Sequence, residues 1–135
     1  MVWTRAVAAW LLIIAAESVQ GTLRQLYLAP VIGDLHARQL GVLTGTVIIA
    51  VITWLLIGWI RPAGARTLLG IGALWVVLTL IFELGLGRLL GFSWSRLLAD
   101  YDPRAGGWMA IGLLVMLWLP WLAARFRGVP QAAPK

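Results

Sequence analysis

Residues 41–60 read GVLTGTVIIAVITWLLIGWI and contain no charged side chain. About twenty mostly apolar residues make a helix long enough to cross the hydrocarbon core of a membrane. Inside lipid the backbone must satisfy its own hydrogen bonds, so a single crossing segment of this length is helical. This stretch therefore predicts a membrane-spanning helix and excludes a water-soluble globule.

Three further apolar runs lie on either side of this segment, at residues 3–20, 67–86 and 107–124. Over all 135 residues, 61% are hydrophobic and 12% are charged, against about 45–50% and about 25% in soluble domains. We expect a single transmembrane domain over residues 1–128, an all-α integral membrane four-helix bundle, and a short mobile tail at 129–135. The first run lacks a clear cleavage site, so it is expected to be a retained span rather than a signal peptide.

The connections between these runs differ in length. Residues 61–66, RPAGAR, predict a tight turn because proline and glycine interrupt helices. The connections at about 21–40 and 87–106 are partly apolar and are expected to lie at the membrane surface, with Pro30 breaking the first and Ser93 capping a short helix in the second. The side that holds both termini carries the larger number of cations, which predicts cytoplasmic termini in a bacterial inner membrane.

The chain resembles itself at an offset of 66 residues, the separation of its only two glutamates. The coinciding polar and glycine positions are Glu17 with Glu83, Gly21 with Gly87, Asp34 with Asp100, Arg38 with Arg104, Gly41 with Gly107, and Arg61 with Arg127. Each unit, at about 1–62 and 67–128, holds two spans. The sequence therefore predicts two parallel-repeat helical hairpins related by a pseudo-two-fold axis along the membrane normal.

This repeat gathers charged residues at one face of the membrane. The candidate substrate or ion site consists of Glu17, Gln20, Arg24, Asp34, Arg38, Glu83, Asp100 and Arg104. Glu17, Gln20 and Arg24 share one helix face if the first helix continues to Arg24. Because a carboxylate within a span is costly, the glutamates predict one of two arrangements. They form ion pairs with Arg38 or Arg104 that hold the connections, or they form a proton or cation site.

Shorter patterns make further predictions. In each Asp-x3-Arg unit we expect the aspartate to cap the next helix and to pair with the arginine four residues later; a clamp for a substrate or lipid phosphate is the alternative. Gly41 and Gly45, four residues apart, predict close helix packing. The expected lipid-phosphate anchors are Arg61, Arg66, Arg125 and Arg127.

Several classes of function are excluded or disfavoured. The chain has no cysteine and one histidine, which excludes thiolate chemistry and a multi-histidine metal site. His36, with Asp34 and Asp102, is the remaining set that could ligate a metal, and we expect neither a metal nor another cofactor. Motifs typical of hydrolases and phosphate-binding enzymes are absent, so an enzyme is disfavoured. The net charge of +6 comes mostly from arginines at the ends of the spans, which indicates membrane lipid rather than nucleic acid as the partner.

Residues 16–24, AESVQGTLR, resemble the first helix of small multidrug resistance transporters, which are four-span proteins with an essential glutamate in that helix. The alignment requires a shift of one residue to match Gly21 and Thr22. Elsewhere this chain departs from that family in its second glutamate, its long polar connections and its internal repeat. No residue role is therefore carried over.

Two functions follow from these patterns. The first is a small transporter or channel for a proton, a cation or a small polar solute, with Glu17 and Glu83 as its charged sites. The alternative is a structural or accessory subunit of a larger membrane complex, in which the same charges form ion pairs and lipid contacts. Four helices leave little room for a wide pore, so a transport path is expected to require a homo-oligomer.

Overall fold

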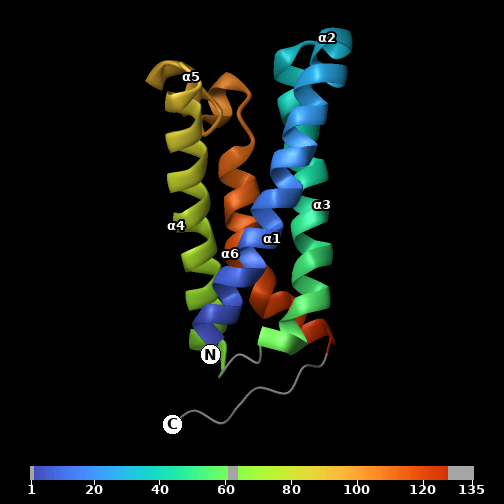
Figure 1. Cartoon of the computed structure of the whole chain (residues 1–135), viewed down its shortest axis with the longest axis vertical. Helices are drawn as coiled ribbons and strands as arrows, with labels where there is room; N and C mark the ends of the chain where they lie inside the picture. The colour runs from blue at the N-terminus through green and yellow to red at the C-terminus, as the bar shows by residue number, and fades with distance from the viewer. Residues whose placement is uncertain (1, 61–63, 128–135) are drawn as a thin grey trace.

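The computed structural model describes residues 2–60 and 64–127, and within these ranges every regular element is helical. Four long helices form an elongated bundle (Figure 1). They are α1 (Val2–Leu23), α3 (Asp34–Ile60), α4 (Ala65–Leu89) and α6 (Met109–Arg127). All four are long and apolar enough to cross a membrane, which indicates an integral membrane protein. The predicted turn at Arg61 and the tail at 129–135 lie outside the described residues.

The first helix is much longer than its apolar run. α1 continues through a π-helical turn, η1 (Arg24–Leu28), and through α2 (Ala29–Ile32). Proline lacks an N–H group, and its ring collides with the carbonyl four residues earlier. The π turn absorbs Pro30, because the Ala29 N–H binds the carbonyl of Arg24, five residues back. The predicted break at Pro30 is therefore wrong, and the helix ends at Gly33, whose φ is 91°.

The predicted long connection at 21–40 is also wrong. α3 begins at Asp34, directly after Gly33, rather than at Gly41. Glycine suits this single-residue link because a positive φ is unfavourable for residues with a Cβ atom. The hairpin of α1 and α3 therefore extends well beyond the two apolar runs that revealed it.

The second hairpin closes differently. After Gly91 (φ 90°), Ser93 caps α5 (Trp94–Ala99) by accepting a hydrogen bond of 3.2 Å from the Arg96 backbone N–H, which confirms the predicted cap. A short 3-10 helix, η2 (Pro103–Ala105), and Gly106 (φ 81°) then lead into α6. The two connections thus have different structures, and the pseudo-two-fold symmetry stays a prediction.

The helices pack as two hairpins placed side by side. α3 lies against both α1 and α6, and α6 also lies against α4. α1 and α4 meet near the start of α1, where the Trp75 indole donates a hydrogen bond of 2.9 Å to the Ala6 carbonyl. The Trp10 indole donates one of 3.0 Å to Thr79 Oγ1.

Apolar side chains fill the end of the bundle where α1 begins and α6 ends. The fully buried members are Ala6, Ile57, Ile60, Leu68, Ile71 and Trp75. Gly72 belongs to the same region, because a Cβ atom there would collide with the backbone of Leu117 on α6. We call this region the packed half. It closes the bundle from one end and leaves the other half free to enclose a cavity.

Candidate functional site

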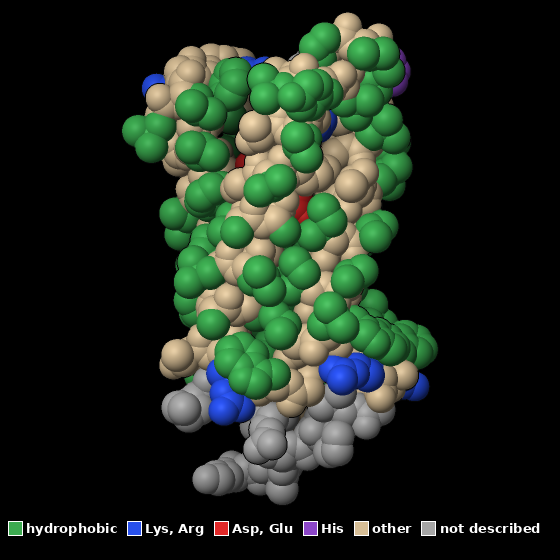
Figure 2. Space-filling model, turned by 45° about the vertical axis from the view of Figure 1, so that its right-hand side comes forward, with side chains coloured by type: hydrophobic (Ala, Val, Ile, Leu, Met, Phe, Trp, Pro, Cys, Tyr) green, Lys and Arg blue, Asp and Glu red, His purple; other side chains and the backbone are tan. Residues whose placement is uncertain are grey.

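The other half of the bundle encloses a cavity of about 480 Å³. Its walls come from all four long helices, with α5 and the residues before α6 near the end where the connections lie. Figure 2 shows acidic side-chain atoms recessed between hydrophobic side chains in the upper part of the bundle. We call this region the cavity half.

Six of the eight residues predicted for the substrate or ion site line this cavity: Glu17, Gln20, Arg24, Arg38, Glu83 and Asp100. Arg104 does not, and the side chain of Asp34 lies outside what the structure describes. The sequence therefore identified the charged part of the cavity, although the residues reach it by a different route from the one expected.

Glu17 projects from α1 into a notch on α3. A Cβ atom at Gly45 would lie 2.6 Å from Glu17 Oε2, so any larger residue there would displace this carboxylate from its present position. Glu17 Oε1 is buried and has no hydrogen-bond partner in the described part of the chain. A buried oxygen of this kind loses its hydration without compensation, so it is available to a bound proton or ligand.

Glu83 projects from α4 into the same cavity. The two carboxylates repel each other electrostatically, and the Arg24 guanidinium attracts both. Among residues 2–60 and 64–127, however, neither glutamate has an ion pair within 4.0 Å. The ion pairs predicted with Arg38 or Arg104 are therefore not formed, because Arg38 binds Asp100 and Arg104 binds Asp102.

Gln20 on α1 and Arg24, the first residue of η1, line the cavity with Glu17, as predicted, because the helix does continue past Gln20. Gln20 Nε2 donates a hydrogen bond of 2.9 Å to the Gly41 carbonyl. Arg24 lies over the same glycine, where a Cβ atom would be 2.7 Å from its Nη1 atom. The Arg24 Nε atom is buried and has no partner within the described residues.

These contacts change the interpretation of Gly41 and Gly45. Their spacing predicts close approach of two helices, and α1 does pack against α3. The space that the glycines leave is filled by the charged ends of Arg24 and Glu17 rather than by apolar packing. The two glycines therefore help to form the site.

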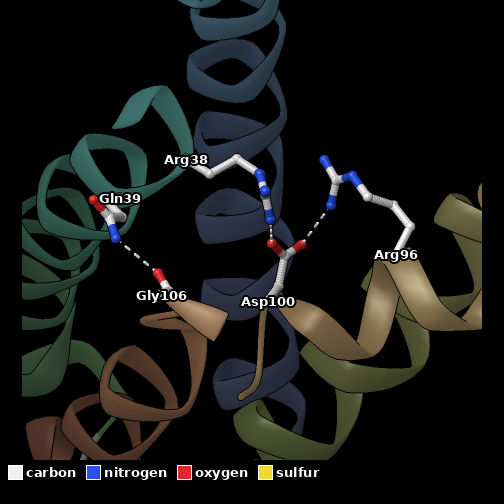
Figure 3. A network of polar contacts seen from close by, with 5 residues as sticks. All are labelled: Arg38, Gln39, Arg96, Asp100 and Gly106. Atoms are coloured by element: carbon white, nitrogen blue, oxygen red, sulfur yellow. Dashed lines mark hydrogen bonds and ion pairs between the residues drawn. The ribbon is translucent and has the colours of Figure 1, made fainter. Parts of the chain in front are cut away.

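A second polar network joins the connections at the end of the cavity away from the packed half, which we call its mouth (Figure 3). Asp100 lies between two arginines: it forms an ion pair with Arg38 on α3 and another with Arg96 on α5, the latter at 3.2 Å. Gln39 Nε2 donates a hydrogen bond of 2.8 Å to the Gly106 carbonyl. This network joins α3 to α5 and to the residues before α6.

The predicted pairing of Asp100 with Arg104 is wrong. Pairing four residues apart requires one continuous helix, but α5 ends at Ala99 and Pro103 starts a separate 3-10 turn. Arg104 pairs instead with Asp102 at 3.4 Å, and its side chain is 93% exposed. The predicted pairing of Asp34 with Arg38 involves a side chain that is not described.

The metal candidates and lipid anchors lie elsewhere. His36 is exposed on the first turn of α3, and within the described residues no three His, Asp or Glu side chains form a cluster suited to a metal.

Arg66 and Arg125 are exposed at the packed end, and Arg125 stacks on Trp121 at 5.3 Å. Arg127 donates a hydrogen bond of 2.8 Å to the Trp54 carbonyl, so it joins α6 to α3.

Sequence reasoning missed the floor of the cavity. Thr79, four residues before Glu83 on α4, accepts a hydrogen bond from Trp10 and lies 3.6 Å from the Met116 sulfur on α6. The spacing of four from a glutamate could have identified Thr79, because such residues share a helix face. The Trp10 and Met116 contacts had no comparable signal in an apolar run.

Tyr101 was also missed. Burial, and after it the negative charge of Glu83, raise the pKa of Tyr101 to about 12. The phenol therefore lies close enough to Glu83 to sense its charge, although it comes from the connection between α5 and η2. Nothing in the sequence around Tyr101 indicates this proximity.

In comparisons with protein-family models, curated proteins and solved structures, nothing matches this chain. Any functional inference therefore depends on the cavity and its residues.

Proposed function

We propose that this chain is a small membrane transport protein that moves a proton, a cation or a small polar solute through the cavity half. One observation carries the proposal: a cavity between four membrane-spanning helices holds Glu17 and Glu83 from two different helices, and Glu17 Oε1 has no hydrogen-bond partner among the described residues. Ionisable residues inside a membrane normally have a partner or a function.

The shape of the bundle supports a transport role. The cavity is closed toward the packed half by Trp10, Thr79 and Met116, and beyond them by a fully buried core. A cavity sealed toward one end of the bundle fits one state of an alternating-access cycle. In this proposal both termini are cytoplasmic, the membrane is a bacterial inner membrane, and the cavity opens toward the opposite side.

A specific observation favours the alternative, a non-transporting accessory subunit. The Arg38–Asp100–Arg96 network fixes the connections of the two hairpins to each other, as a structural role requires. In that function the carboxylates would contribute to folding or assembly, and there would be no flux.

The test is flux into proteoliposomes, with Glu17→Gln/Glu83→Gln compared with the wild type. The assay follows protons, Na⁺, K⁺, small amines and amino acids. Asp102→Asn is the matched control, because Asp102 is a carboxylate outside the cavity. We expect flux in the wild type and the control, and its loss in a double variant that still purifies as a folded protein. Flux retained in the double variant would contradict the proposal, and absence of flux in every protein would favour the accessory subunit.

A further inference from the structure

The cavity holds charges of both signs at separate levels. On α3, the notch at Gly41 receives Arg24 and the notch at Gly45 receives Glu17. Four residues of α-helix rise about 6 Å, so the guanidinium lies roughly one turn from the carboxylate along the bundle. Arg38 and Arg96 lie still nearer the mouth of the cavity, around Asp100. The cavity is therefore negative at its deeper level and positive toward its mouth.

The Glu17 carboxylate and the Arg24 guanidinium each have one buried atom without a hydrogen-bond partner among the described residues. Glu17 Oε1 and Arg24 Nε are both buried without a partner, and over the described residues no ion pair within 4.0 Å joins Arg24 to either glutamate. A simple cation would satisfy the carboxylates and leave the guanidinium unpaired. A simple anion would do the reverse. A ligand with a positive and a negative group satisfies both, with charge-assisted hydrogen bonds at each end.

Much of the remaining wall is apolar, with Ser18, Thr46 and Thr79 among its polar members. Ile49, Phe82, Leu113 and Met116 line the cavity beside the charged residues. The volume of about 480 Å³ lies within the range of small-molecule sites and exceeds what a bare ammonium or carboxylate group would fill. The ligand is therefore expected to carry an apolar substituent next to its charged groups.

We infer that the cavity binds a zwitterion with an apolar substituent, with the amine at Glu17 and Glu83 and a carboxylate or phosphate at Arg24. The inference rests on the proposed function and names its substrate class. Two sources share this chemistry: a free amino acid with an apolar side chain, and the headgroup of phosphatidylethanolamine. A second pocket of about 230 Å³, lined by Arg24 and by Leu23, Leu28 and Leu40, would give the lipid a place for its chains.

The first experiment measures binding to the purified chain in detergent by titration calorimetry. The probes are phenylalanine, 2-phenylethylamine, which lacks the carboxylate, and 3-phenylpropanoate, which lacks the amine. We expect phenylalanine to bind at least about tenfold more tightly than either analogue, because each charge-assisted hydrogen bond is strong. Arg24→Gln should reduce phenylalanine affinity by about tenfold without reducing the affinity for 2-phenylethylamine, because the amine no longer has a guanidinium near it.

A second variant tests whether the weaker binding of Arg24→Gln comes from the lost contact rather than from misfolding. Gly41→Ala keeps the arginine but places a methyl group where its guanidinium now lies, so it should weaken phenylalanine binding in the same direction. Gly85→Ala is the matched control, because nothing lies within 4 Å of a Cβ atom at that position of α4. It should bind phenylalanine as the wild type does.

A separate experiment tests whether the zwitterion is the headgroup of phosphatidylethanolamine. Native mass spectrometry of protein from nanodiscs that contain equal amounts of phosphatidylethanolamine and phosphatidylglycerol measures which lipid is retained. Retention of phosphatidylethanolamine that is lost in Arg24→Gln and in Glu17→Gln, without phenylalanine binding, assigns the zwitterion to the lipid. Phenylalanine binding without selective lipid retention assigns it to the free amino acid.

Two results would overturn the inference. One is equal affinity for phenylalanine and 2-phenylethylamine in both the wild type and Arg24→Gln. The other is binding of neither phenylalanine nor phosphatidylethanolamine. If glutamate-dependent flux of protons or simple cations persists in either case, the proposed function survives and only the substrate class is wrong. If no flux is found either, both proposals fail.

Discussion

The packed half and the cavity half are built from the same four helices, yet they use similar residues in opposite ways. In the packed half Gly72 brings the backbones of α4 and α6 into contact, and Trp75 fills the space that remains. In the cavity half Gly41 and Gly45 make room for charged side chains instead. Glycine in these helices thus allows two backbones to pack closely in one place and leaves space for a charged side chain in another.

The contrast indicates a division of roles. Lipid offers no hydrophobic driving force for helix association, so packing contacts supply much of the stability. The cavity half keeps unpaired polar atoms at a cost to stability, as functional sites commonly do. Substitutions in the packed half should therefore lower the free energy of unfolding, and substitutions in the cavity should mainly change binding.

The largest loss of stability is expected for Trp75→Ala. Trp75 is fully buried, and its indole donates to the Ala6 carbonyl. Truncation of this buried indole should lower the free energy of unfolding by about 3 kcal/mol, which is typical of a buried tryptophan replaced by alanine. Denaturant titration in detergent micelles measures this change. The control Trp54→Ala removes a tryptophan that is 44% exposed and should cost much less. Equal losses would show that the burial of Trp75 is not what stabilises the bundle.

Gly72→Ala should have the next largest effect. A Cβ atom at Gly72 meets the Leu117 backbone, which cannot move aside as a flexible side chain can. Overpacking of this kind costs about 1–3 kcal/mol. Gly85→Ala lies on the same helix with no neighbour near its Cβ position and should gain about 0.5–1 kcal/mol from helix propensity. If both variants were more stable than the wild type, α4 and α6 would not be in close contact at Gly72.

The polar network at the mouth of the cavity should contribute less than either packing site. Asp100→Asn removes the negative charge between Arg38 and Arg96, whose side chains are 18% and 31% exposed. The loss should be about 1 kcal/mol, because partial exposure weakens ion pairs. Asp102→Asn tests a pair whose arginine is 93% exposed, and its effect should be close to zero. Unfolding titrations of both variants in parallel would detect a reversed order, which would contradict a linking role for Asp100.

The sequence predicted the four long apolar helices but not where they end. Hydropathy reports contact with lipid, whereas a helix continues for as long as its backbone hydrogen bonds are satisfied. Polar residues such as Gln20 and Arg24 were therefore expected near a helix end, although they lie in the middle of one continuous helix. The π turn that accommodates Pro30 has no sequence signal that separates it from a helix break.

The site was predictable to a similar extent. Glu17 and Glu83 could be identified because charged residues are rare within apolar runs. The partners of Asp100 could not, because the packing of α3 against α6 brings Arg38 to it. Local spacing rules gave Arg104 instead, and these rules hold only within a single helix.

The smallest effect is expected in the titration of Tyr101, which senses the charge in the cavity from the connection above it. Its pKa is raised from about 10 to about 12 by burial and then by Glu83. Between these two pH values the folded chain holds a proton that the unfolded chain has lost, so this contribution to stability is complete below about pH 10 and disappears as the pH rises toward 12.

Phenolate absorbance, taken as the difference between the wild type and Tyr101→Phe, isolates this group. Glu83→Gln should lower the midpoint, and Glu17→Gln should leave it unchanged, because Glu83 and not Glu17 acts on this phenol. Equal shifts in the two variants would mean that both carboxylates act on Tyr101, and the electrostatic part of its raised pKa would then not belong to Glu83 alone.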